Sequence, residues 1–177
     1  MARRTVEPIG ARERATVIAH TARCIERANR LLETAFAPIP VHFDLIGRTA
    51  GMYRVVRGEP QIRYNPYLFA KYYDENVATT VPHEVAHYLT DAVYGYRNVK
   101  PHGREWRNVM RMLGANDAVR CDFDLEGIPV RRYRTIRYVC RCRSHELTAV
   151  RHNRVQRRRA RYFCRLCHME LMPAADE

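Results

Sequence analysis

A segment near the start of the chain has the hydrophobic spacing of one long helix. Between residues 11 and 36, apolar side chains recur at intervals of three and four, and arginine and glutamate occupy the opposite positions. This pattern is typical of an amphipathic helix that covers a hydrophobic core. Pro38 and Pro40 are expected to end the helix, because proline lacks the amide hydrogen that a helix interior uses.

Three short strands are predicted to follow this helix. Residues 41–46 alternate between apolar and polar side chains, as a half-buried strand does. Two further candidates, 52–56 and 61–65, are separated by a turn that contains glycine and proline. From its place in this order, the third strand is a candidate for an exposed sheet edge, to which a peptide could add as an extra strand.

Two more helices are predicted in the middle of the chain. Residues 83–94 place their apolar side chains opposite His83 and His87, and residues 103–113 have Trp106 and other apolar residues at helical spacing. A glycine follows each segment, which is typical of a helix end.

A sharp change in composition after Gly127 and Pro129 predicts a domain boundary. Residues 131–165 contain thirteen arginines and a single acidic residue. A chain of 177 residues is long enough for one domain with its own core and a small second module. We therefore expect an α+β fold, with helices over a short three-stranded sheet in residues 11–128 and a small β module in residues 129–173.

The net charge of +12 indicates a polyanionic partner such as nucleic acid, and it comes almost entirely from arginine. Arginine binds phosphate through parallel hydrogen bonds, and aromatic rings can stack on unpaired bases. No base-reading motif is visible, so binding should be salt-sensitive and sequence-tolerant; a merely solvated basic face is the alternative. The residues expected to contact nucleic acid are Arg151, Arg154, Arg157, Arg158, Arg159, Arg161 and Tyr162.

The most specific chemical pattern lies at residues 83–87, which read His-Glu-Val-Ala-His, an H-E-x-x-H motif. Residues four apart lie on one face of a helix, about 6 Å apart along its axis, so His83 and His87 can reach one metal ion. Zinc with an open coordination position lowers the pKa of its bound water to about 7, and Glu84 is placed to take that proton. This combination is suited to hydrolysing an amide bond.

A catalytic zinc ion usually has three protein ligands, so a third is needed. His102 is the best candidate, because it lies at a loop-to-helix junction where Gly103 allows a close backbone approach. Glu105, on the helix that follows, is the second candidate. The longer pattern H-E-x-x-H-x-x-G-x-x-H is absent, since Val93 stands at the position of its last histidine.

Four of the six cysteines form two close pairs in the basic region, Cys140 with Cys142 and Cys164 with Cys167. Two such knuckles joined by a hairpin are typical of a zinc ribbon, in which the metal stabilises a module too small for a core of its own. The first pair is one residue closer than usual, so His145 could replace Cys140 or Cys142 as a ligand.

These motifs together resemble the SprT family, the bacterial relatives of the metazoan protease Spartan. The resemblance rests on Val-Pro-His-Glu-Val-Ala-His at 81–87, Pro-His-Gly-Arg-Glu-Trp at 101–106, and Arg-His-Asn-Arg-Val at 151–155 between the cysteine pairs. It implies a zincin-like metalloprotease domain followed by a zinc ribbon. The implied site consists of the general base Glu84, a catalytic zinc ion on His83, His87 and His102, and a structural zinc ion on Cys140, Cys142, Cys164 and Cys167.

Spartan-type proteases cleave proteins crosslinked to DNA and are activated by DNA. The resemblance therefore implies a DNA-dependent zinc metalloendopeptidase whose partners are single-stranded or mixed DNA and the proteins bound to it. The chain begins without the apolar run of a signal peptide and has no stretch long enough to span a membrane. We expect a cytoplasmic, nucleoid-associated monomer.

Two other classes of function fit the same motifs. One is a nucleic-acid-binding regulatory protein in which both zinc sites are structural, and the other is a metal-dependent hydrolase with non-peptide substrates. Glu84 argues against the first class, because a purely structural pair of histidines has no use for that carboxylate.

Overall fold

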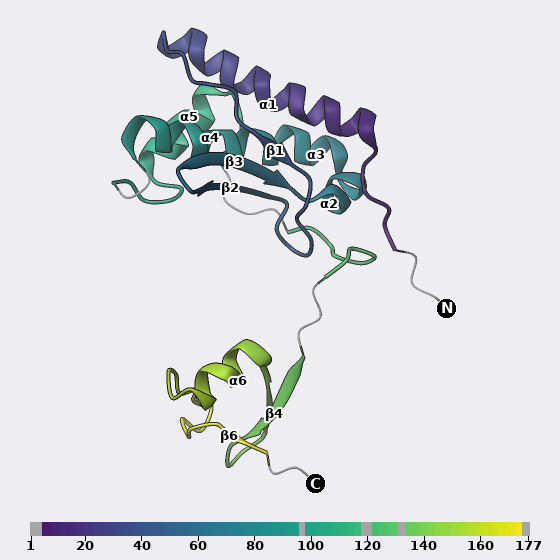
Figure 1. The fold of residues 1–177 in the computed structure, drawn as a ribbon, viewed down its shortest axis with the longest axis vertical. Helices are drawn as coiled ribbons and strands as arrows, with labels where there is room; N and C mark the ends of the chain where they lie inside the picture. The colour runs from purple at the N-terminus through teal and green to yellow at the C-terminus, as the bar shows by residue number, and fades with distance from the viewer. Residues whose placement is uncertain (1–4, 96–97, 118–121, 131–133, 175–177) are drawn as a thin grey trace. The chain divides into compact units, whose positions relative to one another are not determined.

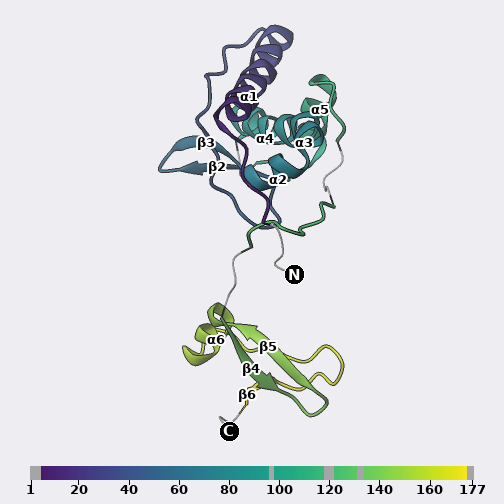
Figure 2. The ribbon, with the colours of Figure 1, turned by 90° about the vertical axis from the view of Figure 1, so that its right-hand side faces the viewer.

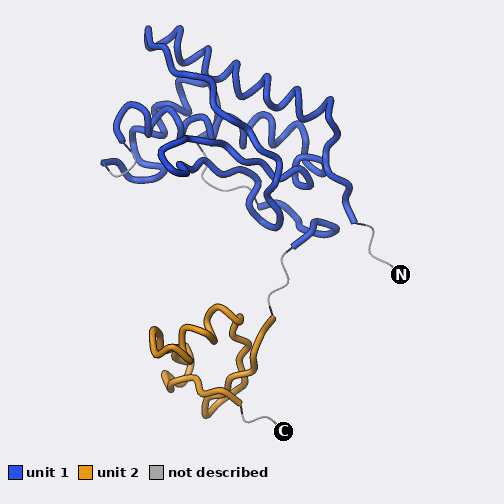
Figure 3. Tube along the Cα trace, viewed as in Figure 1, with its two compact units in different colours: residues 1–130 blue, residues 131–177 orange. Residues whose placement is uncertain are grey.

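The computed structural model of the chain describes residues 5–95, 98–117, 122–130 and 134–174. It divides into two compact units, residues 1–130 and residues 131–177, as the two colours of Figure 3 show. The described residues of each unit combine helical structure with a three-stranded sheet, so the α+β class predicted from the sequence is confirmed (Figure 1). None of the helices in the described ranges is both long and apolar enough to span a bilayer.

The first helix, α1 (Ala11–Leu32), covers one side of the first unit. It ends at Leu32 and not at Phe36 as predicted, because Glu33 adopts the left-handed conformation (φ 51°). The Asn29 side chain then accepts a hydrogen bond from the Phe36 amide, at 2.7 Å, which fixes the turn before the prolines. The residues that α1 buries are Val17, Thr21, Ile25 and Ala28.

The sheet of the first unit contains β1 (Val41–His42), β2 (Gly51–Val56) and β3 (Glu59–Tyr64) in the order β1-β3-β2. The prediction that the third strand is an exposed edge is wrong. β1 pairs with β3 in parallel on one side, and β2 pairs with it antiparallel on the other, so β3 is central and β2 is an edge. β1 is also shorter than predicted, because the chain leaves the sheet after His42.

The helices α2 (Pro66–Lys71), α3 (Tyr73–Ala78), α4 (Thr80–Tyr94) and α5 (Arg104–Met112) follow the sheet. Because α4 begins at Thr80, Pro82 lies in its first turn, where the missing amide hydrogen costs little. α4 packs against α1, α5 and β2, and Figure 2 shows it between α1 and the β2–β3 hairpin. Its fully buried apolar residues are Val81, Val85, Ala86 and Leu89, which form the centre of the core.

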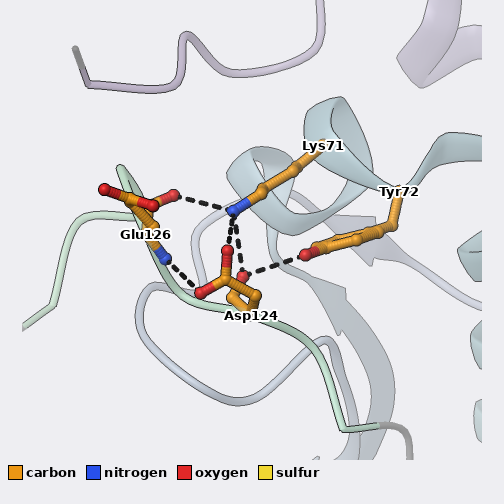
Figure 4. Close-up of polar contacts among 4 residues, drawn as sticks. All are labelled: Lys71, Tyr72, Asp124 and Glu126. Atoms are coloured by element: carbon orange, nitrogen blue, oxygen red, sulfur yellow. Dashed lines mark hydrogen bonds and ion pairs between the residues drawn. The ribbon is translucent and has the colours of Figure 1, made fainter.

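The end of the first unit is held against α2 by polar contacts (Figure 4). The Lys71 ammonium donates to the Asp124 carboxylate at 2.7 Å and to the Glu126 carbonyl at 3.0 Å. The Tyr72 hydroxyl donates to the Asp124 carbonyl at 3.2 Å, and its ring stacks on Phe123. These contacts fix residues 123–126 on the surface of α2.

The second unit contains β4 (Thr135–Val139), β5 (Ser144–Thr148), α6 (Ala149–Gln156) and β6 (Met172–Pro173), with strand order β5-β4-β6. The prediction that a hairpin joins the two cysteine pairs is incomplete, because α6 lies between them. The Thr148 side chain accepts a hydrogen bond from the Arg151 amide and caps this helix. The buried core of the unit is small and consists of Tyr138, Leu147, Cys164 and Leu171.

β2 passes so close to α4 that residue 51 must be glycine. A Cβ atom on Gly51 would lie 2.6 Å from Cγ of Glu84 and 2.7 Å from Cγ2 of Thr80. We predict that Gly51→Ala lowers the free energy of unfolding by roughly 1–3 kcal/mol, the usual cost of overpacking. Urea unfolding of the zinc-saturated protein would measure this, and an unfolding free energy equal to that of the wild type would contradict the contact.

Candidate functional site

Three histidine side chains from two parts of the first unit converge on one point. His83 and His87 lie one turn apart on α4, and His102 lies just before α5. The Nε2–Nε2 distances are 3.3 Å for His83–His87, 3.1 Å for His83–His102 and 3.0 Å for His87–His102. Two nitrogens bound about 2.0–2.1 Å from a tetrahedral zinc ion lie roughly 3.3 Å apart, so the three imidazoles fit one zinc ion.

His102 reaches this cluster through a strained turn. Its backbone is left-handed (φ 57°), and the Gly103 amide donates to the Lys100 carbonyl. A Cβ atom at Gly103 would lie 2.8 Å from that carbonyl oxygen, so the glycine is needed here, as the sequence suggested. Glu105, the second candidate ligand, instead lies 3.6 Å from the Arg104 guanidinium. The structure therefore brings His102 to the other two histidines.

The Trp106 ring packs against all three imidazoles of the histidine cluster. Its ring centroid lies 4.8 Å from that of His83, 5.6 Å from His87 and 4.7 Å from His102, and only 1% of the residue is exposed. Its indole N–H donates to the His83 carbonyl at 3.3 Å. Sequence reasoning treated Trp106 only as a core residue of α5, although its position four residues after His102 could have indicated this role.

Burial keeps the three imidazoles neutral, which is the protonation state that binds a metal ion. It lowers the pKa of His83 to about 4 and that of His87 to about 3, and the neighbouring histidines act in the same direction. The pKa of His102 is also lowered, by burial and by the charge of Arg107.

Glu84 lies beside the cluster with 6% of its surface exposed. One carboxylate oxygen, Oε2, accepts a hydrogen bond from the Tyr53 amide at 2.7 Å. Burial raises the pKa of Glu84 to about 8, and the Tyr53 amide acts in the opposite direction. A cavity of about 320 Å³ opens next to these groups, between residues 51–53 of β2 and residues 99–102. A substrate carbonyl in this cavity would lie next to both the histidines and the carboxylate.

The four paired cysteines of the second unit come together in one cluster. Their Sγ atoms all lie within 4.8 Å of one another, with Cys140–Cys142 at 3.5 Å and Cys142–Cys164 at 3.6 Å. Thiolates bound about 2.3 Å from a tetrahedral zinc ion lie roughly 3.8 Å apart, so Cys140, Cys142, Cys164 and Cys167 fit a closed zinc site. His145 lies next to this cluster, with Nε2 3.2 Å from Cys140 Sγ, while the group whose ligand atoms all come together consists of the four cysteines.

The residues predicted to contact nucleic acid lie on α6 and in the segment that follows it. Arg154, Arg157 and Arg159 line a hollow of about 400 Å³. Arg161 differs, because its guanidinium makes a paired contact with the Glu170 carboxylate, at 2.8 Å for Nε to Oε1. The ring of Tyr162 is covered by a guanidinium, that of Arg151, 5.6 Å from the ring centroid. Arg158 is exposed and has a left-handed backbone (φ 54°).

Comparison with known proteins gives consistent matches along most of the chain. The sequence profile of the SprT-like family matches residues 21–134. Protein SprT of Pasteurella multocida is 34% identical over 151 residues, which cover 85% of this chain and 87% of that protein. Protein SprT of Vibrio parahaemolyticus is 38% identical over 152 residues, which cover 84% and 86% of the two chains. No solved structure matches.

The contact between Trp106 and the histidines predicts a loss of zinc affinity in Trp106→Phe. Outer-shell contacts of metal ligands are worth about 10–100-fold in metal affinity, so we expect a decrease in that range at the histidine site. Chelator competition would measure it, with the cysteine site followed separately by cobalt–thiolate absorption. Val109→Ala is the control, because Val109 is buried on the same helix within the core. Equal losses in both variants would show that Trp106 acts only through stability.

Proposed function

We propose that this chain, which belongs to the SprT-like family, is a zinc-dependent metalloendopeptidase that cleaves proteins bound or crosslinked to DNA. One observation carries the proposal: three neutral imidazoles converge next to a buried carboxylate at an open cavity. A structural zinc site has four protein ligands, whereas the histidine cluster has three in the part of the chain that the structure describes. The first unit would then be a zincin-like peptidase domain.

The residues of the site have distinct roles in this reaction. Zinc bound to His83, His87 and His102 would supply a Lewis acid that polarises a carbonyl oxygen and makes water more acidic. A zinc cation bound nearby would favour the ionised form of Glu84. The carboxylate then accepts a proton from the attacking water and returns it to the leaving amine. The Tyr53 amide takes up one acceptor position on Oε2, which leaves other lone pairs of the carboxylate to accept that proton. The cavity beside β2 holds the substrate backbone close to both groups.

The second unit supplies the attraction to DNA. Arginines concentrate on α6 and the turn after it, and three of them line one hollow. Guanidinium groups bind the phosphate backbone without reading its sequence, so single-stranded or mixed DNA of any sequence could be bound. DNA is favoured over RNA by the resemblance to Spartan. Targeting by DNA would remove the need for a narrow specificity pocket in the first unit.

A cleavage assay would test the peptidase proposal. The substrate is a basic DNA-binding protein, incubated with and without single-stranded DNA, and the variant is Glu84→Gln, which keeps the side-chain volume. We expect DNA-dependent cleavage by the wild type and a loss of at least about 100-fold in the variant, as removal of a general base predicts. Both proteins must first be shown to hold equal zinc. Equal zinc and tight DNA binding with no cleavage by the wild type would support a regulatory protein instead.

The arrangement of arginines predicts unequal effects on DNA binding. Arg154→Ala and Arg157→Ala should each weaken DNA binding, and the loss should be the same for every DNA sequence. Each variant should also reduce the slope of log K against log salt concentration by about 1. Arg161→Ala is the matched control, since its guanidinium is already paired with Glu170, and its effect should be smaller. Fluorescence anisotropy at several salt concentrations would measure the slopes. A larger effect of Arg161→Ala would contradict the assignment.

A further inference from the structure

We propose that Tyr53 and Asp91 form a clamp between β2 and α4 that positions Glu84 for proton transfer. This inference rests on the proposed function, because it takes Glu84 as the general base. Neither Tyr53 nor Asp91 belongs to the H-E-x-x-H motif, and Asp91 lies one helical turn beyond its last histidine. Both residues line the cavity beside the histidines.

Tyr53 contacts α4 at three levels. Its amide donates to Glu84 Oε2 at 2.7 Å, and its hydroxyl donates to Asp91 Oδ2 at 2.5 Å. Its ring lies between these contacts, with its centroid 6.2 Å from that of Tyr88. Residues seven apart lie on the same face of a helix, about 10 Å apart along its axis. A single residue of β2 therefore spans two turns of α4, with Glu84 at one end and Asp91 at the other.

In the described part of the chain, the Glu84 carboxylate accepts its hydrogen bond from the Tyr53 amide. A buried carboxylate that keeps one donor depends strongly on the place of that donor. The donor belongs to the backbone of β2, so no side-chain substitution at residue 53 removes it directly. What a substitution can change is how firmly the strand is held against α4.

β2 needs such an anchor because it is an edge strand. One side of it pairs with β3, and residues 54–56 at its far end are exposed, with Val55 at 47%. Gly51 allows the strand to approach α4 closely but adds no side-chain contact of its own. The hydroxyl of Tyr53 adds a hydrogen bond between side chains of strand and helix, beside the one that Glu84 accepts from the Tyr53 amide. Burial and the bond to Asp91 raise the pKa of Tyr53 far above its ordinary value, so the hydroxyl remains a donor.

The lining of the cavity allows two competing roles for these residues. The Tyr53 hydroxyl could touch the substrate directly, or the Asp91 carboxylate could attract a basic substrate side chain. In the first case Asp91 would be dispensable, and in the second the charge of Asp91 would matter more than its ability to accept a hydrogen bond. The clamp predicts neither result.

The test compares kcat and KM for Tyr53→Phe, Asp91→Ala and the double variant, all with zinc content measured. Loss of either partner should lower kcat by about 10-fold or more, since a misplacement of about 1 Å in a catalytic group can cost 100-fold. KM should change by less than about 2-fold. The kcat of the double variant should be no lower than that of either single variant, because the two residues act as a unit. Asp91→Asn, which keeps an acceptor oxygen, should retain most of the wild-type kcat.

Tyr72→Phe is the matched control, because the Tyr72 hydroxyl also makes one hydrogen bond but lies on the surface near Asp124 (Figure 4). It should leave kcat unchanged. Additive losses in the double variant, or a loss in Tyr53→Phe without one in Asp91→Ala, would overturn the clamp. An increase confined to KM, with Asp91→Asn as damaging as Asp91→Ala, would overturn it in favour of substrate binding.

A second measurement separates the clamp from the peptidase proposal. Amide hydrogen exchange at residue 53, followed by NMR, reports how firmly β2 is held and requires no catalytic activity. Asp91→Ala should accelerate exchange at this amide by about 10-fold or more, whereas Tyr72→Phe should not change it. Unchanged exchange in Asp91→Ala would overturn the clamp even in an active enzyme. Faster exchange in Asp91→Ala, when the wild type shows no cleavage activity, would support the contact between β2 and α4 but reject the proposed function and with it the role in proton transfer.

Discussion

The close packing of β2 on α4 is the contact on which the candidate site depends. Glycine at residue 51 lets the strand lie against the helix, with Glu84 directly beneath it. That approach buries a carboxylate that would otherwise face water, and it also supplies the Tyr53 amide that the buried oxygen needs. The opposite face of α4 lies in the core, through Val85 and Leu89, so the helix cannot turn away from the strand. Core packing and site geometry are therefore set by the same helix.

The spacing of residues along the chain was enough to predict the parts of the site that local geometry fixes. His83 and His87 share a helix face because of the helical repeat, and the two cysteines within each pair lie close because each knuckle is short. The chain could not show which strand is an edge, since β1 pairs with β3 across the residues between them. The same limit applies to the contact of Tyr53 with Glu84, which joins residues far apart in the sequence.

The two units use different physical forces. In the first, the candidate site depends on distances of about 3 Å among three neutral imidazoles and on a buried carboxylate beside them. In the second, thirteen arginines lie in residues 131–165, and the proposed attraction to phosphate would act over about a Debye length without exact placement. The cysteine cluster can stabilise the small second unit, whose buried core has only a few residues among those described. A site of fixed geometry and an arginine-rich unit are thus joined in one chain.

A crystal structure with anomalous scattering at the zinc absorption edge tests the central claim most directly. We predict one zinc ion bound by His83, His87 and His102 with a solvent position facing Glu84, and a second bound by the four cysteines. A fourth protein ligand at the histidine site, or no metal ion there in a zinc-saturated protein, would contradict a hydrolytic centre. A nucleic-acid-binding protein with structural metal alone would then be the better description.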